Sequence, residues 1–163
     1  MVNGNVNVKT DGKGADKIKA DLANLLKMDV LVGVPEDEAA RENDTKINNA
    51  QLMYIHTNGS PMQNIPARPV IEPAIKANKD KITNELQKAA TLALDNKIDD
   101  AKKQLGRAGM LGQNVARGWF TDINNQWTPN APSTIAEKGS SNPLIDTGQL
   151  IKSITYVVRG DKK

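Results

Sequence analysis

Catalysis or metal binding in this chain would have to rest mainly on carboxylates, because its 163 residues include no cysteine and only one histidine, His56. The lack of cysteine excludes disulfides, thiol nucleophiles and Cys/His zinc sites. His56 falls in the last turn of a predicted helix, where a cation interacts favourably with the helix dipole, so we expect a structural role for it. The carboxylate of most interest is Asp146, which follows two apolar residues and precedes Thr147 and Gly148. An aspartate can share a proton with a second carboxylate and so take part in acid–base chemistry.

An Asp-Thr-Gly triplet after two apolar residues resembles the signature of retroviral-type aspartic proteases. Under this alternative the chain is a homodimeric protease that uses Asp146, Thr147 and Gly148 of two copies, and it should form dimers that cleave peptides. Two observations argue against it. Gln149 follows the triplet where that family has Ala or Ser, and the body of the chain is predicted to be helical, without the serial short strands of such a barrel.

The same segment has the pattern of a helix start. Asp146 is a strong N-cap residue, and Gln149 three positions later can complete a capping box. Two flanking apolar residues, Ile145 and Leu150, occupy the positions of a hydrophobic staple. We therefore predict a short helix here that leads into a final strand. The structural or interface candidates in this segment are Ile145, Asp146, Thr147, Gly148, Gln149 and Leu150.

Two further patterns are weaker. Residues 95–100 are similar to the start of a calcium loop, but Lys97 stands at a ligand position and the required glycine and glutamate are missing. Gly106, Gly109 and Gly112 do not form a phosphate loop, since no Gly-Lys-Ser/Thr follows them and a helix precedes them. We expect no catalytic, metal-binding or cofactor-binding residues in this chain.

Hydrophobic periodicity and β-prone runs outline the elements that would position these residues. A helix is predicted over residues 74–105, about 48 Å long at ~1.5 Å per residue, and three glycines separate it from a second helix at 113–123. The remaining predictions are an edge strand at 5–9, helices at 15–27 and 47–56, strands at 29–34 and 154–158, an acidic loop at 36–44, a polar loop at 128–142 and a basic tail at 159–163.

Residues 65–69 cannot be helical, because each of two prolines favours an extended conformation in the residue before it. Arg68 offers a planar fork of donors beside these prolines, which suits a fixed contact to a carboxylate or a carbonyl. The interface candidates in this segment are Ile65, Pro66, Arg68 and Pro69.

The chain is poor in the large side chains that fill a core. It has five aromatic residues and 38% hydrophobic residues, and such a composition favours a subunit that buries surface against neighbours. The net charge of +3 is uneven, with −2 over residues 1–60 and +5 over residues 61–163. This balance is weak for salt-dependent DNA binding, so a DNA-binding packaging accessory protein is a less favoured alternative. No apolar run approaches the ~20 residues of a membrane span, and we expect no membrane association.

Two stretches of the sequence, taken together, are informative about the family to which the chain is similar. The first comprises residues 55–61, 64–69 and 73–75 (Ile-His-Thr-Asn-Gly-Ser-Pro, Asn-Ile-Pro-Ala-Arg-Pro and Pro-Ala-Ile). The second comprises residues 127–129, 132–135, 138, 142–150 and 153–154, with Asn-Pro-Leu-Ile-Asp-Thr-Gly-Gln-Leu at its centre. In this order they resemble the signatures of the neck and virion-morphogenesis (tail-completion) proteins of tailed bacteriophages. The resemblance covers roughly residues 28–158.

The resemblance implies an α+β fold in which a small antiparallel or mixed sheet packs against a long helix, with a second C-terminal helix and extended loops. The length suits a single domain over residues 1–163, with an N-terminal extension (1–27), a core (28–158) and a basic tail (159–163). The family consists of structural virion proteins without enzymatic activity, and it implies a closed six- or twelve-fold ring that joins the DNA-filled head to the tail.

The partners implied by the resemblance are other copies of the chain, head-closure or portal-side connector proteins, and tail terminator, tail tube or sheath proteins. The expected location is the neck or tail junction of the virion, and the host cytoplasm during assembly. No sequence-specific contact with nucleic acid is expected, although DNA would pass through the ring.

Overall fold

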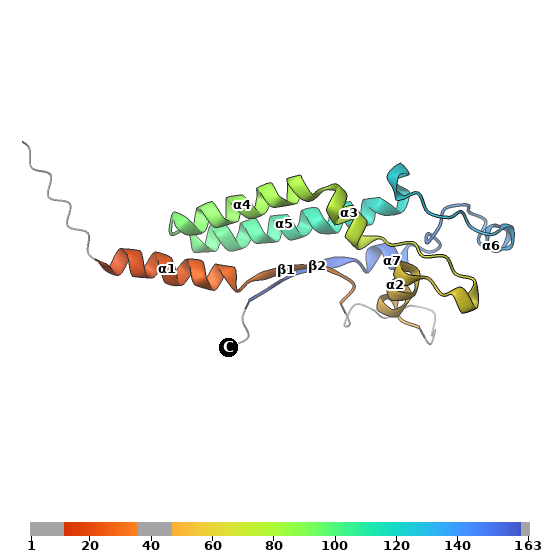
Figure 1. Cartoon of the computed structure of the whole chain (residues 1–163), viewed down its shortest axis with the longest axis horizontal. Coiled ribbons are helices and arrows are strands. Elements are labelled where there is room, and N and C mark those ends of the chain that lie inside the picture. Colours follow the sequence, from red (N-terminus) through yellow and green to blue (C-terminus); the bar gives the residue numbers. More distant parts are fainter. Residues whose placement is uncertain (1–11, 36–46, 161–163) are drawn as a thin grey trace, which may run out of the picture.

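The structure is a computed structural model that describes residues 12–35 and 47–160. The predicted edge strand at 5–9, the acidic loop at 36–44 and the last residues of the basic tail lie outside the described residues. Figure 1 shows an elongated molecule whose long axis follows a hairpin of two helices, α4 (Lys79–Leu94) and α5 (Ile98–Gly118). Helix α1 (Gly12–Leu26) extends past the closed end of this hairpin, and the shorter elements gather at its open end.

The fold is mostly helical α+β, as predicted: the described residues form seven α-helices and a two-stranded antiparallel sheet that packs against α5. Strand β1 (Asp29–Gly33) pairs with β2 (Thr155–Arg159), and the register places Leu31 opposite Val157. Residues at even positions, among them Val30, Val32 and Val158, pack toward the helices. Leu31 and Val157 lie on the outer face, where both side chains are exposed.

The prediction of one helix over residues 74–105 is wrong, because the chain turns back on itself within that range. Helix α3 (Ile71–Ala77) ends at Asn78, and α4 ends before Asn96, whose backbone is left-handed (φ 60°). The amide of Lys97 then donates to the carbonyl of Leu92 at 2.8 Å, which closes the end of α4. Asparagine adopts the left-handed conformation more readily than most residues, but the apolar spacing continues across the turn and therefore concealed it.

Alanines form the contact between the two hairpin helices. Ala89 and Ala93 of α4 and Ala101 of α5 are fully buried, and Ala108 is almost so. Small side chains let the two backbones approach closely, so this contact needs few large apolar residues. The prediction that glycines interrupt the helix near residues 106–112 is also wrong, since α5 runs unbroken to Gly118. The predicted helix at 113–123 is the end of α5 followed by the short 3₁₀ turns η3 (Trp119–Thr121) and η4 (Ile123–Asn125).

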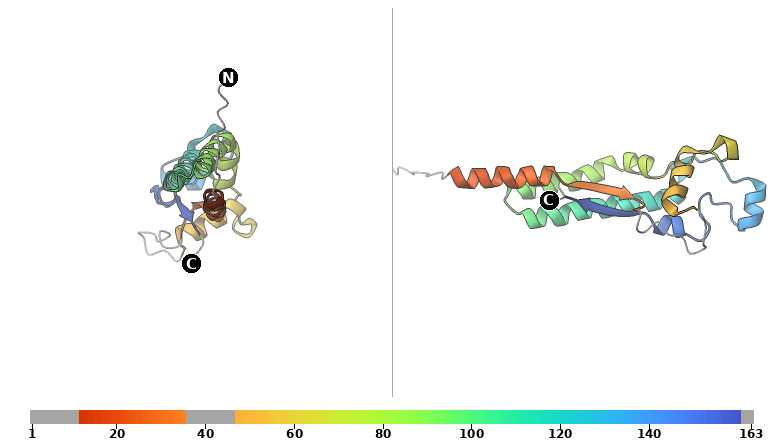
Figure 2. Two further views of the ribbon diagram at one scale, coloured as in Figure 1. Left: turned by 90° about the vertical axis from the view of Figure 1, so that its left-hand side faces the viewer. Right: turned by 90° about the horizontal axis from the view of Figure 1, so that it is seen from below.

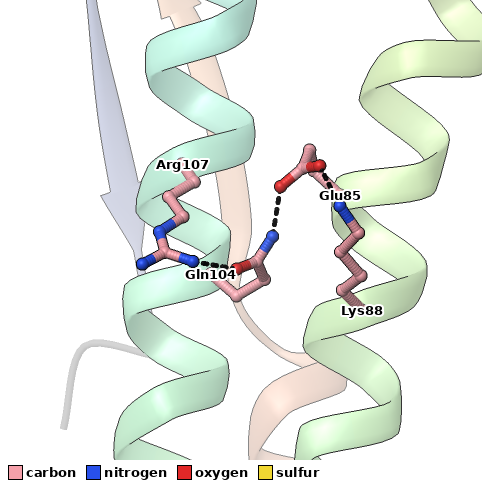
Figure 3. A network of polar contacts seen from close by, with 4 residues as sticks. All are labelled: Glu85, Lys88, Gln104 and Arg107. Carbon is pink, nitrogen blue, oxygen red and sulfur yellow. Dashed lines mark hydrogen bonds and ion pairs between the residues drawn. The ribbon is translucent and has the colours of Figure 1, made fainter.

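Polar side chains also join the two hairpin helices (Figure 3). Gln104 of α5 is buried, donates a hydrogen bond to Glu85 of α4, and accepts one from Arg107 at 3.1 Å. Lys88 lies 2.5 Å from the other carboxylate oxygen of Glu85, and this hydrogen bond holds the pKa of Glu85 below its ordinary value. The network fixes the relative position of α4 and α5 along their length.

A second hydrophobic core, separate from the alanine contact between α4 and α5, lies at the open end of the hairpin. Helix α2 (Asn49–Asn58) begins with a capping box between Asn48 and Gln51, close to the predicted helix at 47–56. The short elements here are η2 (Pro61–Gln63), α6 (Pro132–Lys138) and α7 (Gln149–Lys152). The core at this end of the molecule includes Val70 and Ile154, both fully buried, together with Phe120 and Leu150.

Candidate functional site

The two sequence stretches at residues 55–75 and 127–154 are bound to each other through Arg68. Its side chain is 7% exposed. Its Nε donates to the carbonyl of Thr128 at 3.0 Å, and its terminal Nη2 donates to the carbonyls of Thr128 at 2.8 Å and Pro129 at 3.1 Å. The predicted fixed contact of the guanidinium is therefore made to carbonyls within the same chain. A lysine could not reproduce this arrangement, because its donors lie on a single nitrogen.

A second link runs in the opposite direction, from Trp127 to residues 65–69, which we call the proline segment. The indole Nε1 of Trp127 donates to the carbonyl of Pro69 at 3.1 Å. The same ring packs edge-on against Phe120, with ring centroids 5.9 Å apart. Because Phe120 belongs to the core, these contacts anchor both stretches to the rest of the fold.

The end of α2 positions the proline segment. Gly59 follows the helix with φ 74°, and a Cβ atom at this position would lie 2.9 Å from the backbone nitrogen of Ala67. Only glycine combines this dihedral with so close an approach. An isolated bridge pairs Ser60 with Ile65, and the amide of Arg68 donates to the carbonyl of His56 at 2.6 Å. Pro66 and Pro69 flank this contact within the extended segment.

The predicted helix cap at Asp146 is wrong. Helix α7 starts only at Gln149, its N-cap residue is Gly148 with φ 78°, and no side chain caps it. Asp146 and Thr147 lie in an exposed bend before the helix. The capping box fails because the left-handed Gly148 sets the helix start two residues later than the pattern suggested. Ile145 and Leu150 both join the same core cluster, but not at the positions of a hydrophobic staple.

Most candidate residues of the two segments meet around one cavity of about 260 Å³, which we call the junction cavity. Arg68 of the first segment and residues 146–150 of the second line it, whereas Ile65, Pro66, Pro69 and Ile145 do not. The residues that line it are Leu52, His56, Arg68, Asn130, Thr134, Lys138, Leu144, Asp146, Thr147, Gly148, Gln149 and Leu150.

Electrostatics in the junction cavity oppose a charged imidazole. Burial, and then the positive charges of Arg68 and Lys138, hold the pKa of His56 below its ordinary value. The expected cation that interacts with the helix dipole is thus disfavoured, and His56 is neutral at pH 7. Its Nδ1 is buried and has no hydrogen-bond partner among the described residues. His56 acts here as a packing residue between α2 and the proline segment.

The junction cavity holds little that could do chemistry. Asp146 is the single carboxylate among the described residues that line it. Across residues 12–35 and 47–160 no group of three or more His, Asp or Glu side chains is placed to hold a metal ion. No helix in the described part of the chain is long and apolar enough to cross a membrane. The arrangement is suited to holding two segments of chain together.

A feature that the sequence patterns did not predict is an apolar groove of about 180 Å³ beside β1. It is lined by Val30, Val32, Ile71, Ile75, Ile82, Leu86, Ala108 and Gly112. The continuous hydrophobic run at 29–34 predicts a buried strand, but Leu31 within it is 45% exposed. The alternation between exposed and packed side chains along this strand is visible only once the sheet is known to have two strands.

Comparisons with protein families, with characterised proteins and with solved structures found no significant match to this chain.

Proposed function

We propose that this protein is a structural, ring-forming subunit of the neck or tail-completion complex of a tailed bacteriophage. The observation that carries the proposal is the direct bonding of the two stretches that resemble that family. They lie about 60 residues apart in the chain, and Arg68 and Trp127 join them into one unit. The shared structural role explains why these residue types occur together in both stretches.

The distribution of exposed apolar side chains supports self-association. Leu31 and Val157 face outward opposite each other in the sheet and are 45% and 46% exposed. Other large apolar residues are exposed on the surface of the described part of the chain, among them Tyr54, Met62, Leu94, Met110 and Ile123. Leaving such surface in water costs about 25 cal/mol per Å². A contact between different faces of identical subunits removes this surface from water, and such contacts close into rings.

The partners under this proposal are other copies of the chain, head-closure or portal-side connectors, and tail terminator, tube or sheath proteins. The protein resides at the junction of head and tail in the virion, and in the host cytoplasm during assembly. DNA passes through the ring without sequence-specific contacts. No chemistry is required of the subunit, which agrees with the structural role of Arg68: its side chain lines the junction cavity and donates to the backbone carbonyls of Thr128 and Pro129.

Mass measurements and electron microscopy of the purified protein test the proposal. Over a hundredfold range of concentration we expect a shift from single chains to one closed species of six or twelve copies, visible as rings. Leu31→Lys with Val157→Lys should prevent this shift, because buried unpaired charges are costly. Ala90→Lys, at an exposed position on α4, is the matched control and should assemble normally. A monomer at every concentration, with a sharp melting transition that does not depend on concentration, would show that the proposal is wrong.

A further inference from the structure

The sheet is unusually small, and neither of its outer edges is paired with another strand among residues 12–35 and 47–160. It has two strands, and no backbone hydrogen bond connects β1 or β2 to any other described element. A two-stranded sheet is marginally stable by itself, and an open edge is a template for a further strand. The outer edge of β1 is the more suitable one, because it borders the apolar groove.

The groove lies where the inward-facing side chains of a third strand would fall. Seen from below, β1 lies on the α4 side of the sheet and β2 on the α5 side (Figure 2). The groove is bounded by Val30 and Val32 of β1, by α3 and α4, and by Gly112 of α5, and every side chain that lines it is apolar. Leu86 at its rim is 39% exposed. A strand beside β1 with apolar residues at alternate positions would cover this rim.

The chain contains a segment with this pattern, residues 5–9, which lies outside the described residues. It reads Asn-Val-Asn-Val-Lys, so that Val6 and Val8 share one face and Asn5, Asn7 and Lys9 share the other. An alternation of this kind is typical of a strand that packs one face against an apolar layer.

Residues 5–9 are too far along the chain from β1 to reach the groove of the same subunit. Helix α1 has 15 residues and therefore separates Gly12 from the sheet by about 22 Å at ~1.5 Å per residue. Lys9 is only three residues from Gly12 and reaches about 11 Å from it when fully extended. Figures 1 and 2 show α1 leading away from the sheet and beyond the turn between α4 and α5. Residues 14–17 in its first turns are exposed, as in an arm that projects from the subunit.

We infer that residues 5–9 of a second copy of this chain dock as a third strand on the open edge of β1. Val6 and Val8 then fill the groove, and α1 is the arm that carries the strand from one subunit to the next. Exchange of an identical element between protomers creates a contact at little cost, and strand addition supplies main-chain hydrogen bonds. The contact joins the arm of one copy to the sheet of another and is therefore head-to-tail. This inference rests on the self-association proposed above.

Disulfide mapping between separately tagged copies tests the contact directly, because the chain has no cysteine of its own. One copy carries Asn7→Cys and the other Leu31→Cys, both on the outer face. Residues opposite each other on neighbouring antiparallel strands have Cα atoms about 4.5–5.5 Å apart, within the ~4.4–6.8 Å that a disulfide spans. Asn5→Cys and Lys9→Cys cover registers shifted by two residues. Met62→Cys, at a fully exposed position in η2, replaces Leu31→Cys in the control.

We expect one of the three arm variants to give a covalent dimer with Leu31→Cys in at least about fivefold higher yield than with Met62→Cys. Val6→Asp with Val8→Asp should weaken association at least about tenfold without changing the melting temperature of the monomer. Asn5→Asp with Asn7→Asp, on the other face of the same segment, should leave association within about threefold of the natural chain.

Three results overturn the inference. Equal yields with Leu31→Cys and Met62→Cys in a protein that still forms rings would show a different subunit contact, and the proposed function would stand. A disulfide within single chains that carry both Asn7→Cys and Leu31→Cys, with none between chains, would show that the segment folds back. A protein that remains monomeric under all conditions would refute the contact and the proposed function together.

Discussion

The ring of Tyr156 on β2 lies directly against the backbone of Gly109 on α5. A Cβ atom at position 109 would come within 2.3 Å of Cδ2 and 2.8 Å of Cγ of this ring. Gly112, one turn later, has the same relation to β1, since a Cβ there would lie 2.9 Å from Val32. The sheet therefore packs directly against the backbone of α5 at both glycines. Because these positions have no side chain, they set the distance between the sheet and α5.

Gly109→Ala should destabilise the protein by about 1–2 kcal/mol. The added methyl group overpacks the contact at the base of the Tyr156 ring, which costs about 1–3 kcal/mol, while the better helix propensity of alanine returns about 0.5–1 kcal/mol. Gly106→Ala is the matched control, because a Cβ there would meet only the Tyr156 hydroxyl at an ordinary 3.8 Å. It should be neutral or stabilising in urea denaturation. Equal effects of the two substitutions would refute the packing argument.

Arg68→Ala should lower the free energy of unfolding by about 1.5–3 kcal/mol, the range for hydrogen bonds of a charged group. It leaves the carbonyls of Thr128 and Pro129 without their donor. Arg68→Lys should recover little of this loss, because lysine cannot reproduce the fork. Lys76→Ala, at an exposed site on the neighbouring helix α3, should have almost no effect. Ring assembly should follow the same order, and a normal melting curve for Arg68→Ala would contradict this view of the site.

Gly148→Ala should cost about 1–2 kcal/mol, because alanine is strained in the left-handed conformation that starts α7. Asp146→Ala should change stability by less than about 0.5 kcal/mol, as expected for an exposed side chain away from special features. A helix cap at Asp146 would reverse this order, so thermal melts of the two variants distinguish the interpretations. A peptide-cleavage assay of the natural chain and of Asp146→Asn tests the protease alternative. Cleavage by the natural chain that is lost in Asp146→Asn would support that alternative.

The parts of the fold that follow from local patterns were predictable. The helix at 15–27 and the strands at 29–34 and 154–158 correspond closely to α1, β1 and β2. The proline segment was correctly predicted not to be helical, since its prolines restrict the backbone regardless of what surrounds them. The small sheet packed against a long helix was also correct.

The hairpin and the site were harder to predict because they depend on tertiary contacts. A left-handed Asn96 ends α4, but the apolar spacing on either side of it fits one continuous helix. Gly109 was interpreted as a break, because its partner Tyr156 lies 47 positions away and only the fold brings them together. The same holds for Arg68, whose donor fork was foreseen but whose acceptors on Thr128 and Pro129 were not.

His56 should make the protein less stable as the pH falls below neutrality. Its pKa is lowered in the folded state, mainly by burial and also by Arg68 and Lys138. Between the folded pKa and the ordinary value of 6.5, the unfolded chain binds a proton that the folded chain does not. Stability therefore rises with pH through this window, is complete above pH 6.5, and is lost as the pH falls toward the folded pKa.

The measurement is a series of thermal melts between pH 5 and pH 8 for the natural chain and for His56→Gln. Because His56 is the only histidine and carboxylates titrate mainly below about pH 5, the difference between the two series reports this residue alone. The natural chain should lose stability from pH 7 to pH 5.5, and His56→Gln should lose much less, since glutamine remains uncharged. Lys138→Ala in the natural background should weaken the pH dependence, because it removes one of the two positive charges that oppose protonation of the ring. Parallel curves for the natural chain and His56→Gln, or a natural chain that is more stable at pH 5.5 than at pH 7.5, would show that the imidazole is not held neutral between α2 and Arg68.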